Sequence, residues 1–176
     1  MSGSNGTAVA ADRALVDAVT AFLYDESAAL DEHRPQDWLD LLTEDFEYLV
    51  PLVEIYEDPA RSPYHPTTFL DHESKGGLAL KLLRAASDYA WAQRPTGFLR
   101  HFVGNVRVMG TPERPDDVVV RSNVLVTWTR DPEPTRQMSA GRLDHVRRTD
   151  DGFRLSRRTV FLDTAHPHAA QLWVVY

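Results

Sequence analysis

Apolar residues recur at three- and four-residue steps near the start of the chain, from about Asp12 to Asp31. Such spacing places these side chains on one face of an α-helix. The positions concerned are Leu15, Val19, Phe22, Leu23 and Leu30. The pattern predicts a first helix that packs one face on a core.

The stretch "HRPQDWLDLLTED" predicts a short second helix. Pro35 suits the first turn of a helix, where its missing N–H needs no partner. Trp38, Leu41 and Leu42 then share one face. The next stretch, "FEYLVPL", predicts a strand that ends near Pro51, because proline cannot donate to a sheet ladder.

Residues 53–70 hold three prolines and scattered charges, which predicts a long loop without regular structure. The sequence that follows predicts a third helix. Asp71 is its expected N-cap, and Leu78, Leu82 and Leu83 form its apolar stripe.

Four segments with alternating apolar and polar residues fill the rest of the chain, at 98–108, 117–130, 136–148 and 153–163. Asp-Gly before the last segment is typical of a hairpin turn. Helices followed by a run of strands predict an α+β fold. We expect a domain in which a curved antiparallel sheet wraps around the three helices.

Length and composition suit one domain. At 176 residues the chain can bury a sizeable core, and we expect a single domain at 13–176 after a flexible tail at 1–12. The tail lacks the basic and apolar regions of a signal peptide, and no run is long enough to span a bilayer, so a cytoplasmic protein is expected.

The predicted strands carry apolar residues on both faces. The first strand places His101, Val103 and Asn105 on one face and Phe102, Val106 and Val108 on the other. In the second, Val118, Val120, Val124, Val126 and Trp128 lie opposite Leu125, and in the fourth, Phe153, Leu155 and Phe161 lie opposite Val160 and Leu162. One face can cover the helices. The other predicts contact with a further chain, unless its valines are simply scattered on the surface.

Charge and cysteine content exclude several functions. The net charge is −7, from 19 basic and 26 acidic residues, which argues against binding nucleic acid through bulk charge. The chain has no cysteine, so it offers no thiolate for zinc, for an iron–sulfur cluster or for nucleophilic catalysis. Phosphate-binding and serine-hydrolase motifs are also absent from the sequence.

The seven histidines do not form a strong metal motif. Asp163, His166 and His168 nominally supply a two-histidine, one-carboxylate set, but a solvated loop is the favoured interpretation. We therefore predict no metal and no cofactor in this chain.

One pair of residues retains a possible chemistry. Asp31 ends the first helix and His101 lies on a strand, so a curved sheet could bring them together. The carboxylate could then orient the imidazole as a general base. The other interpretation, which we favour, is a hydrogen-bonded pair that satisfies two buried polar groups.

Three groups of residues stand out by their order and spacing, rather than by any single motif. They are Tyr24, Glu26, Leu30 and Asp31 before Trp38-Leu39, then Ala90, Trp91, Arg94 and Pro95, and lastly Arg100, His101, Asn105 and Val106. Together these stretches, over about residues 18–163, resemble the small, or β, subunit of aromatic-ring-hydroxylating dioxygenases.

The resemblance implies the cone fold that is shared with ketosteroid isomerase and scytalone dehydratase. In this fold a strongly curved mixed or antiparallel sheet wraps around about three N-terminal helices as a cone-shaped α+β barrel. It also implies a structural subunit without an active site, assembled with a large α subunit and with other copies of itself as α3β3. The α subunit would hold the Rieske 2Fe-2S cluster and a mononuclear iron. The alternative is a stand-alone cone-fold dehydratase or isomerase, for which the resemblance assigns Asp31, His101 and Asn105 to the site.

Overall fold

The computed structural model describes residues 13–86, 97–109 and 117–167. The predicted tail at 1–12 and the residues from Ala90 to Pro95 lie outside the described residues.

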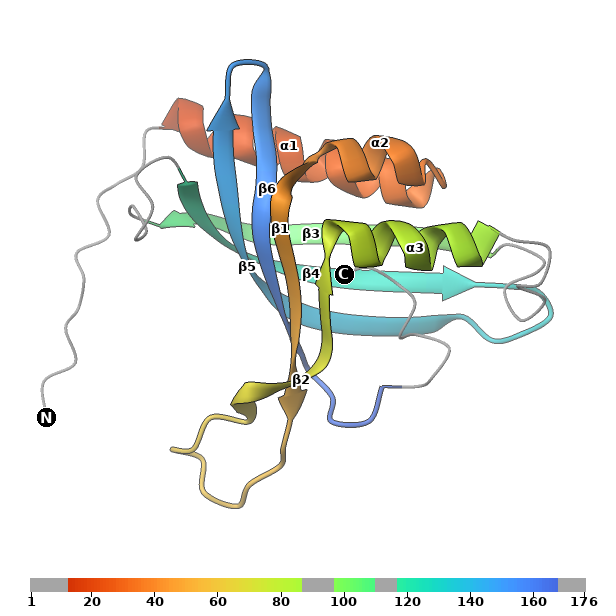
Figure 1. Cartoon of the computed structure of the whole chain (residues 1–176). Helices are drawn as coiled ribbons and strands as arrows, with labels where there is room; N and C mark the ends of the chain where they lie inside the picture. The colour runs from red at the N-terminus through yellow and green to blue at the C-terminus, as the bar shows by residue number, and fades with distance from the viewer. Residues whose placement is uncertain (1–12, 87–96, 110–116, 168–176) are drawn as a thin grey trace, which may run out of the picture.

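Three helices and six strands make up the described fold (Figure 1). The helices are α1 (Arg13–Asp31), α2 (Pro35–Asp40) and α3 (Lys75–Ala86). The strands are β1 (Leu42–Val53), β2 (Tyr64–Ser74), β3 (Phe98–Met109), β4 (Asp117–Thr129), β5 (Arg136–Thr149) and β6 (Gly152–Leu162). The first helix and the last four strands match their predicted ranges within about two residues. No helix of the described ranges is long and apolar enough to cross a bilayer.

The strands form one sheet in the order β2-β1-β6-β5-β4-β3. Strands β1 and β6 run parallel, and every other neighbouring pair is antiparallel. The predicted α+β class with a mixed sheet is therefore confirmed. The sheet is open rather than a closed barrel, because β2 and β3 are its two edges.

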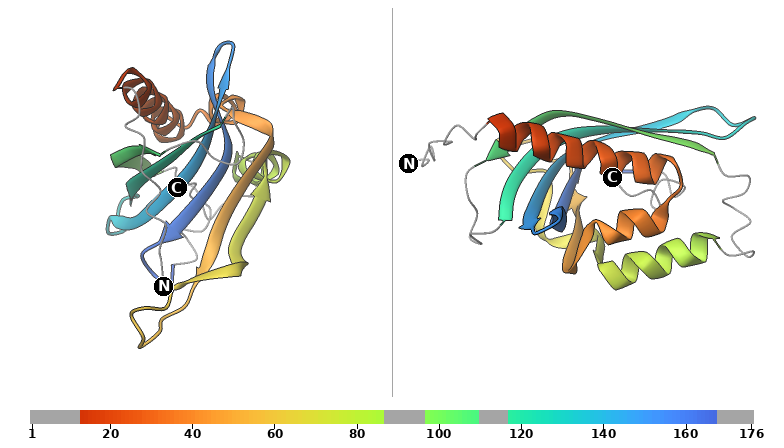
Figure 2. Two further views of the ribbon diagram at one scale, coloured as in Figure 1. Left: turned by 90° about the vertical axis from the view of Figure 1, so that its left-hand side faces the viewer. Right: turned by 90° about the horizontal axis from the view of Figure 1, so that it is seen from above.

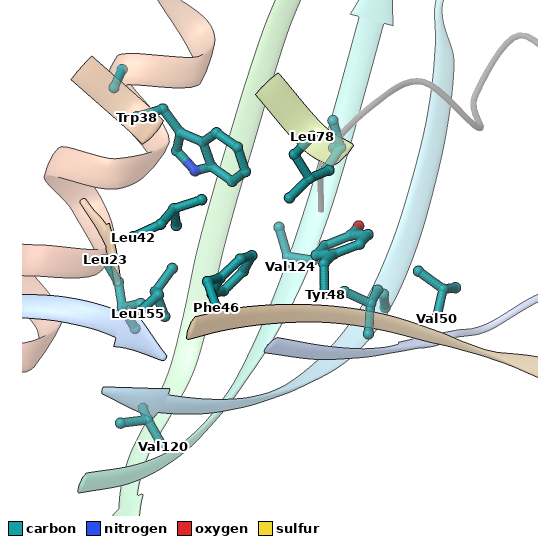
Figure 3. Close-up of a cluster of buried hydrophobic side chains, with 14 of the residues drawn as sticks. Leu23, Trp38, Leu42, Phe46, Tyr48, Val50, Leu78, Val120, Val124 and Leu155 are labelled. Atoms are coloured by element: carbon teal, nitrogen blue, oxygen red, sulfur yellow. The ribbon is translucent and has the colours of Figure 1, made fainter. Parts of the chain in front are cut away.

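The core lies between the three helices and the face of the sheet that they cover, here called the inner face (Figure 2). Side chains from all three helices meet strand residues there, as Figure 3 shows for Leu23, Trp38 and Leu78 against Phe46 and the strand residues around it. Burying apolar area of this kind contributes about 25 cal/mol per Å². The helices thus define an inner face, and the opposite, outer face stays exposed.

The predicted loop at 53–70 holds only for residues 54–63, because β2 begins at Tyr64, and the predicted cap of the third helix was wrong. Pro66 lies within β2, where proline is tolerated because an edge strand directs unpaired groups to solvent. Asp71 pairs with Val50 in the sheet, and its carboxylate binds the Lys81 ammonium at 2.8 Å. The cap is instead Ser74, whose hydroxyl accepts a hydrogen bond from the backbone N–H of Gly77, the third residue of α3, at 3.2 Å.

Three smaller predictions differ from the structure. Strand β1 continues through Pro51, because the sheet register shifts there and the strand pairs only with β2 beyond Leu49. Leu42 leaves the second helix and starts β1, where it pairs with Leu155. Leu83 faces solvent on α3 instead of joining the apolar stripe.

A register shift in the β5–β6 hairpin reverses part of the predicted alternation. Ser156 is the extra residue, and it is buried. Phe153 therefore packs on the core, together with Leu162, while Phe161 points outward and stacks edge-on against Tyr64. The hairpin turn itself is confirmed, and its glycine adopts a positive φ of 133°.

Candidate functional site

The structure brings Asp31 and His101 together. The Asp31 carboxylate accepts the backbone N–H of His101 at 3.0 Å and lies 2.7 Å from ring atom Nδ1. The His101 side chain is almost fully buried, and Asp31 is largely covered. The carboxylate thus binds the backbone and the ring of the same residue, and orients the imidazole with Nδ1 toward it.

The position of Asp31 explains why the pair forms. Asp31 is the last residue of α1, where the helix carries partial negative charge that disfavours a carboxylate. The two donors of His101 offset that unfavourable position. Just beyond it the chain turns at His33, which has a φ of 55° and whose ring contacts the Gly97 carbonyl at 3.2 Å. The end of α1 is therefore tied to β3, beside which it packs.

Asn105 does not join this pair, which corrects the prediction that it shares a face with His101. Asn105 has a φ of 53° at a register shift between Gly104 and Arg107. This bulge turns Asn105 outward and brings Val106 inward, to the side of His101. A site of Asp31, His101 and Asn105 is therefore not assembled.

The most buried charges among the described residues form a network that sequence reasoning missed. Arg158 donates to both oxygens of Glu26 and to Asp144, with bonds of 3.0 Å from Nη2 to Glu26 and 2.8 Å from Nε to Asp144. The Trp38 indole N–H donates to Glu26 at 2.9 Å, and Arg142 lies 3.6 Å from the same carboxylate. The sequence did contain an indication of this network. The alternation along β5 places Arg142 and Asp144 at positions that face the core.

The network keeps Glu26 ionised. Burial alone would raise its pKa, but Arg158 and Arg142, with hydrogen bonds from Arg158 and Trp38, lower the pKa to about 2. Burial and the neighbouring Arg158 lower the pKa of Arg142. Arg142 donates through Nε to Ser122 at 3.2 Å, while its buried Nη2 has no hydrogen-bond partner among the described residues. The positive charges of two arginines and the negative charges of two carboxylates thus compensate each other in the core.

The nominal metal set is not assembled within the described residues. The Asp163 carboxylate accepts a hydrogen bond from the Ser139 hydroxyl at 2.7 Å, and His166 is exposed. His168 lies outside the described residues. The described ranges contain no group of three or more histidine, aspartate or glutamate side chains placed to hold a metal ion.

A shallow hollow of about 410 Å³ lies on the outer face of β3, β4 and β5. Gly104 and Gly141 contribute no side chains to it, which leaves the space open. Its rim and walls include Tyr64, Phe102, Asn105, Asn123, Leu125 and Asp163. The hollow lies on the face opposite the Asp31–His101 pair.

Solved structures share this arrangement of helices and sheet. Naphthalene 1,2-dioxygenase with indole bound matches with a TM-score of 0.81 and 20% identity, over 93% of this chain and 86% of that chain. A candidate scytalone dehydratase from Novosphingobium aromaticivorans matches with a TM-score of 0.62 and 18% identity, over 88% and 89% of the two chains. The fold is therefore the cone-shaped α+β fold that both structures have.

Sequence similarity then identifies the family. The model of the ring hydroxylating beta subunit family matches residues 25–166. The 3-phenylpropionate/cinnamic acid dioxygenase subunit beta of Photorhabdus laumondii is 34% identical over 151 residues, which cover 84% of this chain and 83% of that protein. The chain belongs to the family of ring-hydroxylating dioxygenase β subunits, and the predicted family is confirmed.

Proposed function

We propose that this chain is the structural β subunit of a cytoplasmic, multicomponent aromatic-ring-hydroxylating dioxygenase that serves the breakdown of aromatic compounds. The observation that carries the proposal is the family match, which runs from Asp25 to His166 and so includes the whole sheet and both ends of the Asp31–His101 pair. The dioxygenase β subunit at 34% identity supports it.

The partner in this proposal is a large α subunit, joined with copies of the present chain as α3β3. The α subunit would hold the Rieske 2Fe-2S cluster and the mononuclear iron. The residues of this chain support that division of labour. The sequence has no cysteine for an iron–sulfur cluster, and the described part of the chain brings together no set of metal ligands.

The Asp31–His101 pair has a structural role in this proposal. The Asp31 carboxylate makes its hydrogen bonds with the backbone N–H and the ring of His101. These bonds hold the end of α1 against β3. We call this pair a structural clip, because its hydrogen bonds fix the position of a helix end relative to an edge strand. The chain itself then performs no chemistry.

The second candidate is a stand-alone dehydratase or isomerase. The 2.7 Å contact between Asp31 and Nδ1 of His101 favours it, because a carboxylate that orients an imidazole is a common arrangement for a general base. The third proposed member, Asn105, faces the other side of the sheet, which counts against this candidate.

Purification of the chain alone and with its α subunit tests the proposal. We expect the isolated chain to contain substoichiometric iron and to show no Rieske absorbance, because its side chains offer no ligand set. Light scattering of the mixture should reveal a mixed complex, and metal analysis should assign its iron to the α subunit.

Three results would contradict the proposal. One iron per isolated chain, retained after chelation, would place a metal centre here. A stable monomer that does not bind the α subunit would exclude a subunit role. Dehydratase or isomerase turnover by the isolated chain, abolished by His101→Ala, would support the second candidate.

A further inference from the structure

An exposed patch on the outer face combines apolar and cationic side chains. Phe102 on β3 lies directly opposite Leu125 on β4, and these side chains are 59% and 37% exposed. Phe98, four residues before Phe102 on the same side of β3, is 71% exposed. The outer-face patch consists of Phe98, Arg100, Phe102, Arg107, Arg121 and Leu125.

The arginines of the patch lack acidic partners. Arg100, Arg107 and Arg121 are exposed, and none forms an ion pair with a carboxylate of the described ranges. Elsewhere on the sheet arginines are paired, as Arg147 is with Asp45 and Arg157 is with Glu47. Three uncompensated cations along the outer face of β3 and β4 stand out on a chain whose net charge is −7.

Two of these cations oppose each other directly. Arg107 and Arg121 are cross-strand partners in the β3–β4 ladder. Like charges at such positions destabilise the free sheet. A carboxylate from outside the chain would relieve this repulsion, so the arrangement favours the bound state over the free one.

The adjoining hollow supplies room for an inserted side chain. Phe102 and Leu125 line its wall, and a methyl group added at Gly104 would meet no atom within 4 Å. Apolar anchors that fill a pocket within a charged rim are typical of protein interfaces. The patch and hollow therefore suit a segment that carries both an apolar side chain and carboxylates.

A second copy that packs its own outer sheet face on the patch fits less well. The outer-face carboxylates of β1, Asp45 and Glu47, already bind Arg147 and Arg157 of their own chain. Because these two carboxylates are already neutralised, they would attract the arginines of a neighbouring copy only weakly. A different polypeptide with free carboxylates matches it better.

We propose that the outer-face patch is the surface that docks the large α subunit, through an α-subunit segment with an apolar anchor for the hollow and acidic side chains for the three guanidinium groups. This inference rests on the proposed function and adds the face and the chemistry of the contact.

Arg121→Glu tests the inference because it acts in opposite directions on stability and on assembly. In the free chain, the substitution replaces a repulsive cross-strand pair by an attractive one, so the melting temperature should equal or exceed that of the wild type. Co-expressed with the α subunit, the variant should assemble with an affinity that is lower by about tenfold or more, and with a weaker salt dependence.

Phe102→Ser removes one of the three apolar side chains of the patch and should weaken the same assembly. The matched controls are Leu83→Ser, which removes an exposed leucine from α3, and Arg13→Glu, which reverses an exposed charge on α1. Both controls should assemble like the wild type. Affinities come from light scattering or titration calorimetry of the purified components.

The outcomes separate this inference from the proposed function. If the wild type assembles with the α subunit and Arg121→Glu and Phe102→Ser assemble equally well, the docking face is elsewhere and the subunit role stands. If these variants lose self-association but keep α-subunit binding, the patch joins copies of this chain and the inference fails. If the wild type does not bind the α subunit, both proposals fail.

Discussion

Asp31 holds His101 by its backbone N–H and by its ring, and the two contacts have different consequences for function. The backbone contact fixes the strand beside the helix end, whatever the ring does. The ring contact is the part that a general base would need. Substitutions of the ring therefore separate a structural clip from a catalytic pair.

We predict that His101→Ala lowers stability without lowering the specific activity of the assembled oxygenase. Loss of the ring leaves the covered carboxylate with one donor fewer, at a cost of about 1–3 kcal/mol. The melting temperature and the yield of complex should fall. Product formed per α-subunit iron should remain that of the wild type.

His101→Asn provides the matched variant, because its side-chain amide can place a donor near the position of Nδ1. A structural clip should regain much of the lost melting temperature in this variant. A general base would not be restored, since an amide accepts no proton at neutral pH. Near-total loss of activity in a correctly assembled, iron-loaded His101→Ala complex would contradict the structural role.

Element by element, irregular positions decide which face a side chain occupies. The bulge at Asn105 reverses the alternation of β3, and the extra residue Ser156 does the same in β6. Strict period-two reasoning fails beyond such a point, because one inserted residue moves every later side chain to the other face.

We predict that Asn105→Val destabilises the chain by about 1–2 kcal/mol, because a β-branched residue is strained at a φ of 53°. Asn105→Gly should be nearly neutral, since glycine adopts a positive φ without a steric cost. Urea unfolding of the two variants measures the difference. Equal stability of both variants would show that the backbone bulge does not constrain this residue.

At the scale of the whole molecule, the buried charges join separate parts of the fold. Glu26 belongs to α1, Asp144 to β5 and Arg158 to β6, and the three form one network together with Arg142. A paired network of this kind adds little over an apolar core, but removal of one member leaves a buried charge uncompensated.

We predict that Glu26→Gln lowers the free energy of unfolding by about 3–5 kcal/mol at neutral pH, because Arg158 and Arg142 then share one carboxylate. The folded pKa of Glu26 is about 2, below its ordinary value of 4.5. Its stabilisation is therefore complete above about pH 4.5 and is lost as the pH falls toward 2.

Urea unfolding of the wild type and of Glu26→Gln between pH 7 and pH 3 tests both parts. The difference between the two proteins should shrink below pH 4.5. Glu44→Gln is the control, because this exposed carboxylate binds only at the surface, to Lys75, and its loss should change little. A constant difference across the whole pH range would exclude the proposed ionisation of Glu26.

The local pattern was sufficient for the bounds of α1 and of the four C-terminal strands, because periodicity and turn residues along the chain mark where such long elements begin and end. It was insufficient for β2, where Pro66 and many polar residues are compatible with an edge strand only because β1 lies beside it. The edge position is a property of the sheet, which no local window of sequence contains.

The sequence by itself determined the α+β class, the main elements and the family of this protein, since periodicity and motif order are written along the chain. Only the tertiary structure decided which charges meet. Asp31 and His101 are 70 positions apart, and Glu26 and Arg158 are 132 apart. Their pairing depends on sheet order and helix packing, and a single bulged residue determines that Asn105 faces the other way.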